Sequence, residues 1–306
     1  MVAVTELGYI GIGVSDTEAW KSYATEVVGM EVLEEGLDDR FFLRLDSWHH
    51  RIAVHSSGED DLLYLGWRVA GRVEFEAMQR QLDDAGLSYE IGSPELAEER
   101  HVLDILTLTD PAGIRTEIFH GPEIALHKPF HPGRPLHGRF STGDGGAGHC
   151  ILSQPDSEAA YRFYKVLGLE GGLEVKIRPP EAPMPVDLHF MHCNDRQHSV
   201  AWTAPPLSTK MINHLMFEYD NILDLGRAHD LVNDRGIPVA MSLGVHANDR
   251  ILSFYSASPS GWMIELGAPI GQDHATQSEH YRSDIFGHRV MELATFADGV
   301  DPGDQT

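Results

Sequence analysis

The chain has 306 residues, of which 42% are hydrophobic and 8% aromatic, so it is long enough for two domains with substantial cores. It carries 23 basic and 47 acidic residues, and the net charge of -24 argues against nucleic acid as a partner, because phosphate binding needs a basic surface. The sequence has no apolar run near the roughly 20 residues that cross a bilayer and no secretory signal pattern at its start, so we expect a cytoplasmic protein without membrane contact.

Amphipathic helices alternate with short strand-like runs along the chain. The first helix is expected to begin at Ser15, which can form a capping box with Glu18, and to end at Gly29. Other helices are expected at about 75–85, 160–167 and 222–232, with strand-like runs such as 41–45 and 251–255 between them. The simplest account is an α+β fold of four βαβββ modules, paired into two barrel-like domains.

The segment from about 121 to 146 is rich in Pro, Gly and His, as expected of a linker between the two halves. We therefore predict an N-terminal domain of two modules over residues 1–135 and a C-terminal domain of two modules over residues 136–306. The polar tail after Gly271 is expected to form coil and a short helix.

A weak internal repeat relates the two halves. Residues 8–19 align with 148–159 at an offset of 140, and 48–53 and 110–113 align with the second half at an offset of 148. At this register three potential metal ligands of the second half have the following counterparts in the first: Tyr9 for His149, Gly66 for His214, and Glu117 for Glu265. Two of the three ligands are missing from the first half, so we predict one metal per chain, in the second half only.

Each of these three residues lies in a strand-like run, and Glu265 interrupts an otherwise apolar one. Because two cysteines cannot form a thiolate zinc site, any metal must be held by histidine and carboxylate. Two imidazoles and one carboxylate form the facial triad that binds Fe(II) and leaves adjacent positions open. The alternative is that both histidines are satisfied core residues and that Glu265 pairs with an arginine; Glu218 is a rival ligand on the strand of His214.

At this point the sequence resembles a known family. The motifs are Gly148-His149 and the runs 194–201, 213–216, 243–249, 253–255 and 258–265, with the start 6–9 and the tail 285–288. They resemble the two-domain type I extradiol catechol dioxygenases of the vicinal oxygen chelate superfamily, which include the 2,3-dihydroxybiphenyl 1,2-dioxygenases. One departure is Gln197, where many relatives carry a second histidine.

The resemblance implies that His149, His214 and Glu265 bind Fe(II), with Mn(II) as the lesser alternative. It implies that His198 takes a substrate proton, that His246 is a second acid-base group, and that Tyr255 hydrogen-bonds a substrate oxygen. Without the resemblance, His198 would be an ordinary strand histidine and Tyr255 a core aromatic residue. Asp249 either orients His246 or a substrate hydroxyl, or caps its loop.

The function implied is meta cleavage of a catechol with insertion of both atoms of O2, as in aromatic hydrocarbon catabolism. The expected substrate is a bulky 3-substituted catechol, either 2,3-dihydroxybiphenyl-like or a fused-ring diol. Two alternatives are a non-catalytic ligand-binding protein and a glyoxalase-type metal enzyme of the same superfamily. Relatives are often octamers or smaller assemblies, so a homo-oligomer is expected, with the octamer among the options.

Overall fold

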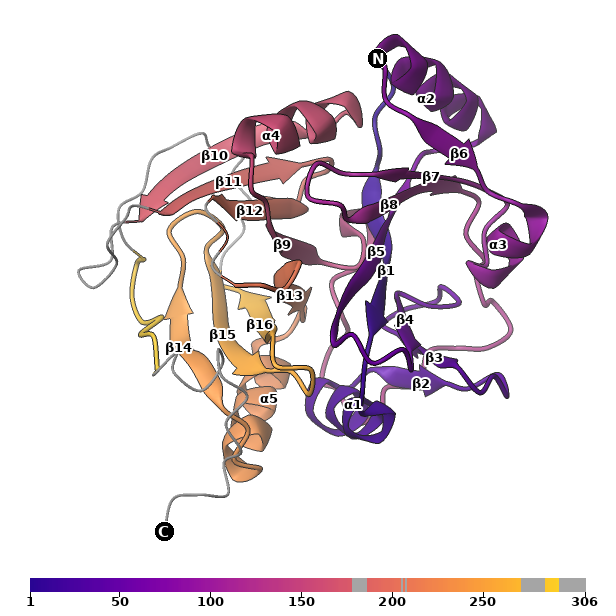
Figure 1. Cartoon of the computed structure of the whole chain (residues 1–306). Helices are drawn as coiled ribbons and strands as arrows, with labels where there is room; N and C mark the ends of the chain where they lie inside the picture. The colour runs from indigo at the N-terminus through magenta and orange to yellow at the C-terminus, as the bar shows by residue number, and fades with distance from the viewer. Residues whose placement is uncertain (178–185, 205, 207, 271–283, 292–306) are drawn as a thin grey trace.

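A computed structural model describes residues 1–177, 186–204, 206, 208–270 and 284–291, and most of the polar tail predicted as coil and short helix lies outside these residues. The strands form two eight-stranded sheets, one from each half of the chain (Figure 1). No helix among the described residues is both long and apolar enough to span a membrane.

The elements of the first half are β1 (Glu6–Gly13), α1 (Thr17–Ser22), the π-helix η1 (Tyr23–Val28), β2 (Glu31–Leu33), β3 (Arg40–Arg44), β4 (Ile52–His55), β5 (Asp61–Arg68), α2 (Arg72–Asp84), β6 (Tyr89–Ile91), α3 (Pro94–Glu99), β7 (Asp104–Thr109) and β8 (Arg115–His120). A short 3-10 helix η2 (Gly143–Gly145) precedes the second half. That half contains β9 (His149–Ser153), α4 (Ser157–Val166), β10 (Glu170–Ile177), β11 (Val186–His192), β12 (Val200–Ala204), β13 (Ile212–Glu218), α5 (Ile222–Asp234), β14 (Val239–Val245), β15 (Ile251–Ala257) and β16 (Met263–Pro269).

The two sheets have the same topology. Their strand orders are β2-β3-β4-β1-β5-β8-β7-β6 and β10-β11-β12-β9-β13-β16-β15-β14, which differ only by eight strands in numbering. In each module the first and last strands pair in parallel, and the remaining neighbours are antiparallel. The prediction of four βαβββ modules is confirmed, with α3 as an addition in the second module. The boundary between 135 and 136 stays a prediction, since it falls between the end of β8 and the start of β9.

The start of α1 differs by one residue from the prediction. The cap of α1 is Asp16, not Ser15, and its side chain accepts a hydrogen bond of 2.9 Å from the amide of Ala19. Asp156 caps α4 in the same way through the amide of Ala159. The carboxylate reaches the amide three residues on, which is the preferred N-cap geometry. After Ser22 the helix continues as η1, and Gly29 ends it in a left-handed conformation, as predicted.

One hydrophobic core extends through both halves. At the junction the ring of Trp20 on α1 packs against that of Trp262, with centroids 5.3 Å apart, and its Nε1 donates to Ser260 Oγ at 2.8 Å. Tyr23 adds a hydroxyl contact of 2.8 Å with Ser256 on β15. The first half therefore supports β15 and the turn that leads into β16. These two strands carry the predicted site residues Tyr255 and Glu265.

Candidate active site

Strand pairing brings the three predicted metal ligands together on the second sheet. Met216 on β13 is in register with His149 on β9 and with Glu265 on β16. His214 lies two residues before Met216 and so faces the same side of the sheet. Tyr255 on β15 is in register with Glu265 and extends the row by one strand. Residues far apart in the sequence thus become neighbours through the order of the strands.

The ligand atoms face one another directly. Glu265 Oε2 lies 3.2 Å from His149 Nε2 and 3.3 Å from His214 Nε2, and one ligand atom from each residue lies within 4.8 Å of the others. All three side chains are buried. His214 Nδ1 donates to Asn213 Oδ1 at 2.9 Å, a contact that orients the ring with its Nε2 toward Glu265. The geometry therefore directs Nε2 of both histidines toward one carboxylate.

The electrostatics of the triad fit a divalent cation. Burial lowers the pKa of His149 to about 4, an effect larger than the opposing influence of Glu265. Burial alone would raise the pKa of Glu265, but hydrogen bonds from both histidines hold it well below its usual range. The other oxygen, Oε1, is buried without a partner among the described residues. Two imidazoles beside a charged carboxylate with an unpartnered oxygen are the donors that a divalent transition metal prefers.

The two alternative readings of these ligands do not match the contacts. Glu265 faces histidines rather than an arginine. The rival carboxylate Glu218 is engaged by Arg196, whose Nη1 lies 2.6 Å from Glu218 Oε2. Arg196 also donates to the backbone oxygens of Gly145 and Ser141, so it is fixed in place beside the site.

The first sheet has a different arrangement at the equivalent place, and one predicted counterpart is wrong. Gly66 pairs with Tyr9 and Glu117, as Met216 pairs with His149 and Glu265. Gly66 is therefore equivalent to Met216, and Tyr64 takes the position of His214. The offset between the copies is 140 at Tyr9, 148 over 48–53, 150 at Gly66 and 148 again at Glu117, and no motif marks the change to 150.

In the first sheet an arginine, rather than a metal ion, pairs with the carboxylate. Arg100 Nε lies 3.0 Å from Glu117 Oε2, and the hydroxyl of Tyr9 donates to the same oxygen at 2.7 Å. The guanidinium also lies over the ring of Tyr64, 4.0 Å from its centroid. A Cβ on Gly66 would lie 2.3 Å from the ring of Tyr9, so that ring fills the remaining space. At this position the first half holds a closed polar cluster rather than a ligand set.

His198 lies beside the triad. Its ring centroid is 3.8 Å from that of His149, and its Nδ1 donates to Gln197 Oε1 at 2.6 Å. Burial, together with the nearby His149, lowers the pKa of His198 well below its usual range. The ring is therefore neutral, with Nε2 free to accept a proton. Gln197, the departure from the family pattern, orients this ring.

His246 and Tyr255 form a second group on the other side of Glu265. His246 Nε2 lies 2.7 Å from the Tyr255 hydroxyl, and its Nδ1 lies 2.7 Å from Asp284 Oδ1. Burial opposes charge on this ring, but the hydrogen bond to Asp284 and the charge of Asp249 outweigh it and raise the pKa of His246 to about 9. Burial raises the pKa of Tyr255 well above its usual range, so its hydroxyl stays protonated.

Two residues of this group were missed by sequence reasoning. Asp284 also lies 3.2 Å from His288 Nδ1, and the ring of His288 lies 3.9 Å from that of His246. The signal that could have found them is the tail motif 285–288, which resembles the family although it has no counterpart in the first half.

Asp249 is buried, and its Oδ1 accepts a hydrogen bond of 3.0 Å from the amide of Ile251, as a loop-capping residue does. Burial raises its pKa to about 7. A small cavity beside the triad is lined by His149, Arg196, Gln197, His198, Met216, Glu218, Asp249 and Ile251. His198 and Asp249 therefore share this cavity with His149, whereas His246 and Tyr255 do not border it.

Comparison with known proteins defines the class first. Residues 146–266, which carry all three ligands of the triad, match the family described as "Glyoxalase/Bleomycin resistance protein/Dioxygenase superfamily". Residues 7–57 match the family described as "Dihydroxybiphenyl dioxygenase BphC D1". The two-sheet fold with a buried triad is thus a vicinal oxygen chelate fold.

Individual relatives narrow the assignment. The chain is 55% identical over 288 residues to a biphenyl-2,3-diol 1,2-dioxygenase of Sphingomonas paucimobilis, covering 94% of this chain and 95% of the relative. It is 53% identical to a 1,2-dihydroxynaphthalene dioxygenase of Sphingobium xenophagum, covering 94% and 96%. A crystal structure of a catechol 2,3-dioxygenase superposes with a TM-score of 0.93 at 49% identity, covering 97% and 98%. The chain belongs to the extradiol catechol dioxygenases, and its activity is oxidative cleavage of a catechol ring beside the diol.

Proposed function

We propose that the chain binds Fe(II) through His149, His214 and Glu265 and uses it to open a bicyclic catechol. The observation that carries the proposal is the buried triad, in which one carboxylate oxygen lies within 3.3 Å of two imidazole nitrogens. This donor set is typical of Fe(II) oxygenases. When bound, the ion holds the diol and O2 in contact and allows electrons to pass between them. Mn(II), which accepts the same donors, is the lesser alternative.

We assign the proton chemistry to two histidines, one neutral and one protonated. His198 is neutral, with its Nδ1 hydrogen held by Gln197, so Nε2 is the atom that accepts a proton from a substrate hydroxyl. His246 has a pKa of about 9, so it is protonated at neutral pH and can deliver a proton from Nε2. The pair therefore supplies one base and one acid for a single turnover.

Tyr255 and Asp249 are proposed to support this pair. The Tyr255 oxygen accepts from His246, which leaves the phenol hydrogen available to a substrate oxygen. Asp249 holds its loop through the amide of Ile251 and contributes negative charge that favours protonated His246. Of the two roles predicted for Asp249, the hydrogen bond favours loop capping, and the charge effect adds a positioning role.

The substrate class follows from the relatives. The biphenyl-2,3-diol and the 1,2-dihydroxynaphthalene that name them each carry a second ring next to the diol. We infer that this chain prefers such bicyclic diols to unsubstituted catechol. In the reaction the carbon–carbon bond beside the diol breaks and both atoms of O2 enter the ring-opened keto acid. The substrate supplies the electrons that reduce O2, so no further reductant is needed.

The two alternative functions explain less of the site. A ligand carrier has no need for a buried metal triad beside one neutral and one protonated histidine. A Mn(II)-bound glyoxalase of Novosphingobium aromaticivorans shares the fold, but it is 19% identical to this chain. The relatives above 50% identity are all named dioxygenases.

The test is to load the protein anaerobically with Fe(II) and then add air with 2,3-dihydroxybiphenyl, 1,2-dihydroxynaphthalene or catechol. We expect O2 uptake and a coloured product, with kcat/KM about 10-fold higher for the bicyclic diols, because the second ring adds apolar contact. A parallel sample loaded with Mn(II) distinguishes the two metals. The absence of O2 uptake with all three diols would contradict the proposal. Light scattering during gel filtration tests the predicted homo-oligomer in the same preparation.

A further inference from the structure

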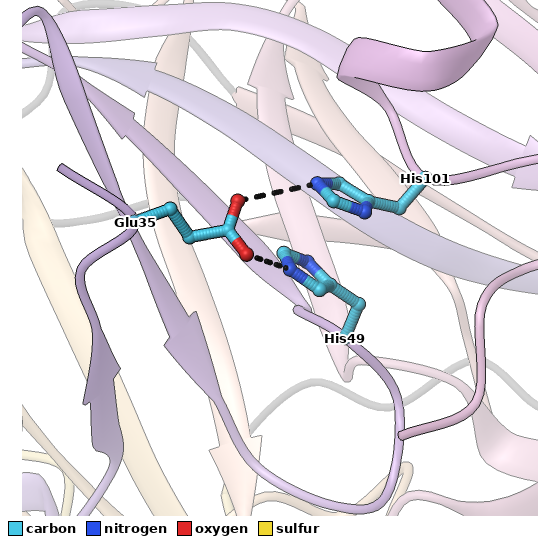
Figure 2. A group of neighbouring side chains, drawn as sticks. All are labelled: Glu35, His49 and His101. Atoms are coloured by element: carbon cyan, nitrogen blue, oxygen red, sulfur yellow. Dashed lines mark hydrogen bonds and ion pairs between the residues drawn. The ribbon is translucent and has the colours of Figure 1, made fainter. Parts of the chain in front are cut away.

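We propose that the first half contains a second metal site, formed by Glu35, His49 and His101, which binds a divalent transition ion such as Zn²⁺. Figure 2 shows the three side chains converging, with both imidazole rings directed at one carboxylate. They come from three separate segments: Glu35 follows β2, His49 precedes β4, and His101 follows α3. This site is distinct from the Tyr9, Glu117 and Arg100 cluster that replaces the catalytic triad, and it would give the chain a second metal where the sequence repeat predicts only one.

The donor atoms are close enough to share one ion. His49 Nε2 lies 3.0 Å from Glu35 Oε1, and His101 Nε2 lies 3.6 Å from Glu35 Oε2. One ligand atom from each residue lies within 4.8 Å of the others. Because each ring offers Nε2 and the carboxylate offers two oxygens, the cluster can supply three or four donors. Imidazole donors favour zinc and its neighbours over magnesium or calcium.

The far nitrogens of both rings have partners, and that of His101 is a carboxylate, as is typical of metal-bound histidines. His101 Nδ1 donates to Glu123 Oε2 at 2.8 Å, and His49 Nδ1 lies 3.0 Å from His50 Nδ1. A carboxylate on the far nitrogen fixes the ring tautomer and makes the near nitrogen a better donor. The backbone of Glu123 also joins the two histidines, since its carbonyl accepts from His49 N at 3.0 Å and its amide donates to His101 O at 2.8 Å.

An adjacent buried nitrogen points to a ligand at this place. His50 is 3% exposed, and its Nε2 has no partner among the described residues. It lines a small cavity together with His49, His101 and Glu123. A water in this cavity would give this nitrogen the hydrogen-bond partner that a buried polar atom requires.

His101 has an uncommon backbone conformation, and its ring is stacked on that of His49. His101 has a φ of +55°, a left-handed conformation that side-chain-bearing residues seldom adopt and that is often retained at functional sites. The rings of His49 and His101 are stacked, with centroids 3.4 Å apart and an angle of 11°. Because the lone pair of each Nε2 lies in the plane of its ring, the two stacked rings must tilt before both can bind one ion. Binding would therefore separate the stacked rings and link three segments of the first half.

The experiment measures Zn²⁺ bound in addition to iron. The full chain, loaded anaerobically with Fe(II), is incubated with Zn²⁺ at pH 8, desalted, and analysed for both metals by mass spectrometry. We expect one Zn²⁺ per chain beyond the iron, and X-ray absorption at the zinc edge should show two imidazole ligands. His101→Gln and Glu35→Gln should lose the Zn²⁺ and keep the iron. Glu123→Gln should weaken Zn²⁺ binding by about 10-fold.

Two further variants make the result specific. His127→Gln removes an exposed histidine outside the cluster and should bind Zn²⁺ as the parent does. His214→Ala should still take up one Zn²⁺, which the added His101→Gln should abolish, so this arm is independent of the iron proposal. Circular dichroism verifies that each variant is folded. Absence of bound Zn²⁺ in both the parent and His214→Ala, or equal binding by His101→Gln and the parent, would overturn the inference.

Discussion

Glu265 and Glu117 occupy equivalent positions in the two sheets, and their neighbours give them different chemistry. Glu265 faces two imidazoles and keeps one oxygen unpartnered among the described residues, whereas Glu117 is fully engaged by Arg100, Arg115 and Tyr9. The same carboxylate is thus a proposed metal ligand in one half and part of a closed ion-pair network in the other.

This difference predicts opposite results for the same substitution. Glu265→Gln should lose iron and lower the rate of O2 uptake by about 100-fold or more, because the charged ligand is gone. Glu117→Gln should keep iron but lower the free energy of unfolding by about 3 kcal/mol, because it leaves the buried Arg100 without its main partner. Iron content and urea denaturation measure the two effects. Iron loss in Glu117→Gln with iron retained in Glu265→Gln would reverse the assignment.

Asp284 should set the pH range of the reaction through His246. A raised pKa keeps His246 protonated up to about pH 9, so its role as an acid is lost as the pH rises through that value. By the same linkage, the contribution to folding stability is full below the unfolded pKa near 6.5 and is lost toward about pH 9. Asp284→Asn removes the stabilising charge and should move the alkaline limb of kcat/KM to lower pH.

The control for this prediction is Asp220→Asn, which removes an exposed carboxylate paired with Arg139. An alkaline limb that stays in place in Asp284→Asn would show that Asp284 does not act through His246.

Asp284 was missed because the tail has no periodic pattern. The triad could be predicted because Glu265 interrupts an apolar strand and the motifs around the three residues resemble the family, whereas the position of Gly66 could not, because register depends on bulges in the pairing.

At the scale of elements, local patterns predicted the helices better than their ends. Apolar spacing and a following glycine located α1, α2, α4 and α5, but six residues of π-helix in η1 cannot be distinguished from α-helix by spacing. The helix α3 has a serine cap and a proline in its first turn, yet it is too short to show a period. The predicted cap of α1 was one residue too early because Ser15 and Asp16 are both good caps, and only the backbone conformation selects between them.

The caps give an element-scale prediction. Asp156→Ala should lower the free energy of unfolding by about 1 kcal/mol, because the amide of Ala159 loses its acceptor. The matched control is Glu158→Ala, two residues further on, where an exposed ion pair with Arg162 contributes about 0.5 kcal/mol or less. Urea denaturation compares the two. Equal losses of unfolding free energy in both variants would show that the cap of α4 contributes no more stability than an exposed ion pair.

At the scale of the whole molecule, duplication supplied two similar halves that share one core. The sequence repeat predicted the duplication, but the packing between the halves, such as Trp20 against Trp262, is not visible in periodicity because it depends on distant residues. A continuous core predicts cooperative unfolding. Fluorescence and circular dichroism should therefore report coincident urea transitions, and two separated transitions would show that the halves unfold independently.

We place the catalytic metal in the second sheet and expect none at the equivalent place in the first sheet. The most direct measurement is anomalous diffraction at the iron edge from crystals of protein loaded anaerobically with Fe(II). We expect a peak about 2.2 Å from His149 Nε2, His214 Nε2 and a Glu265 oxygen, and no peak between Tyr9, Tyr64 and Glu117. Iron bound at the first-sheet position, or no iron at the triad, would contradict this placement.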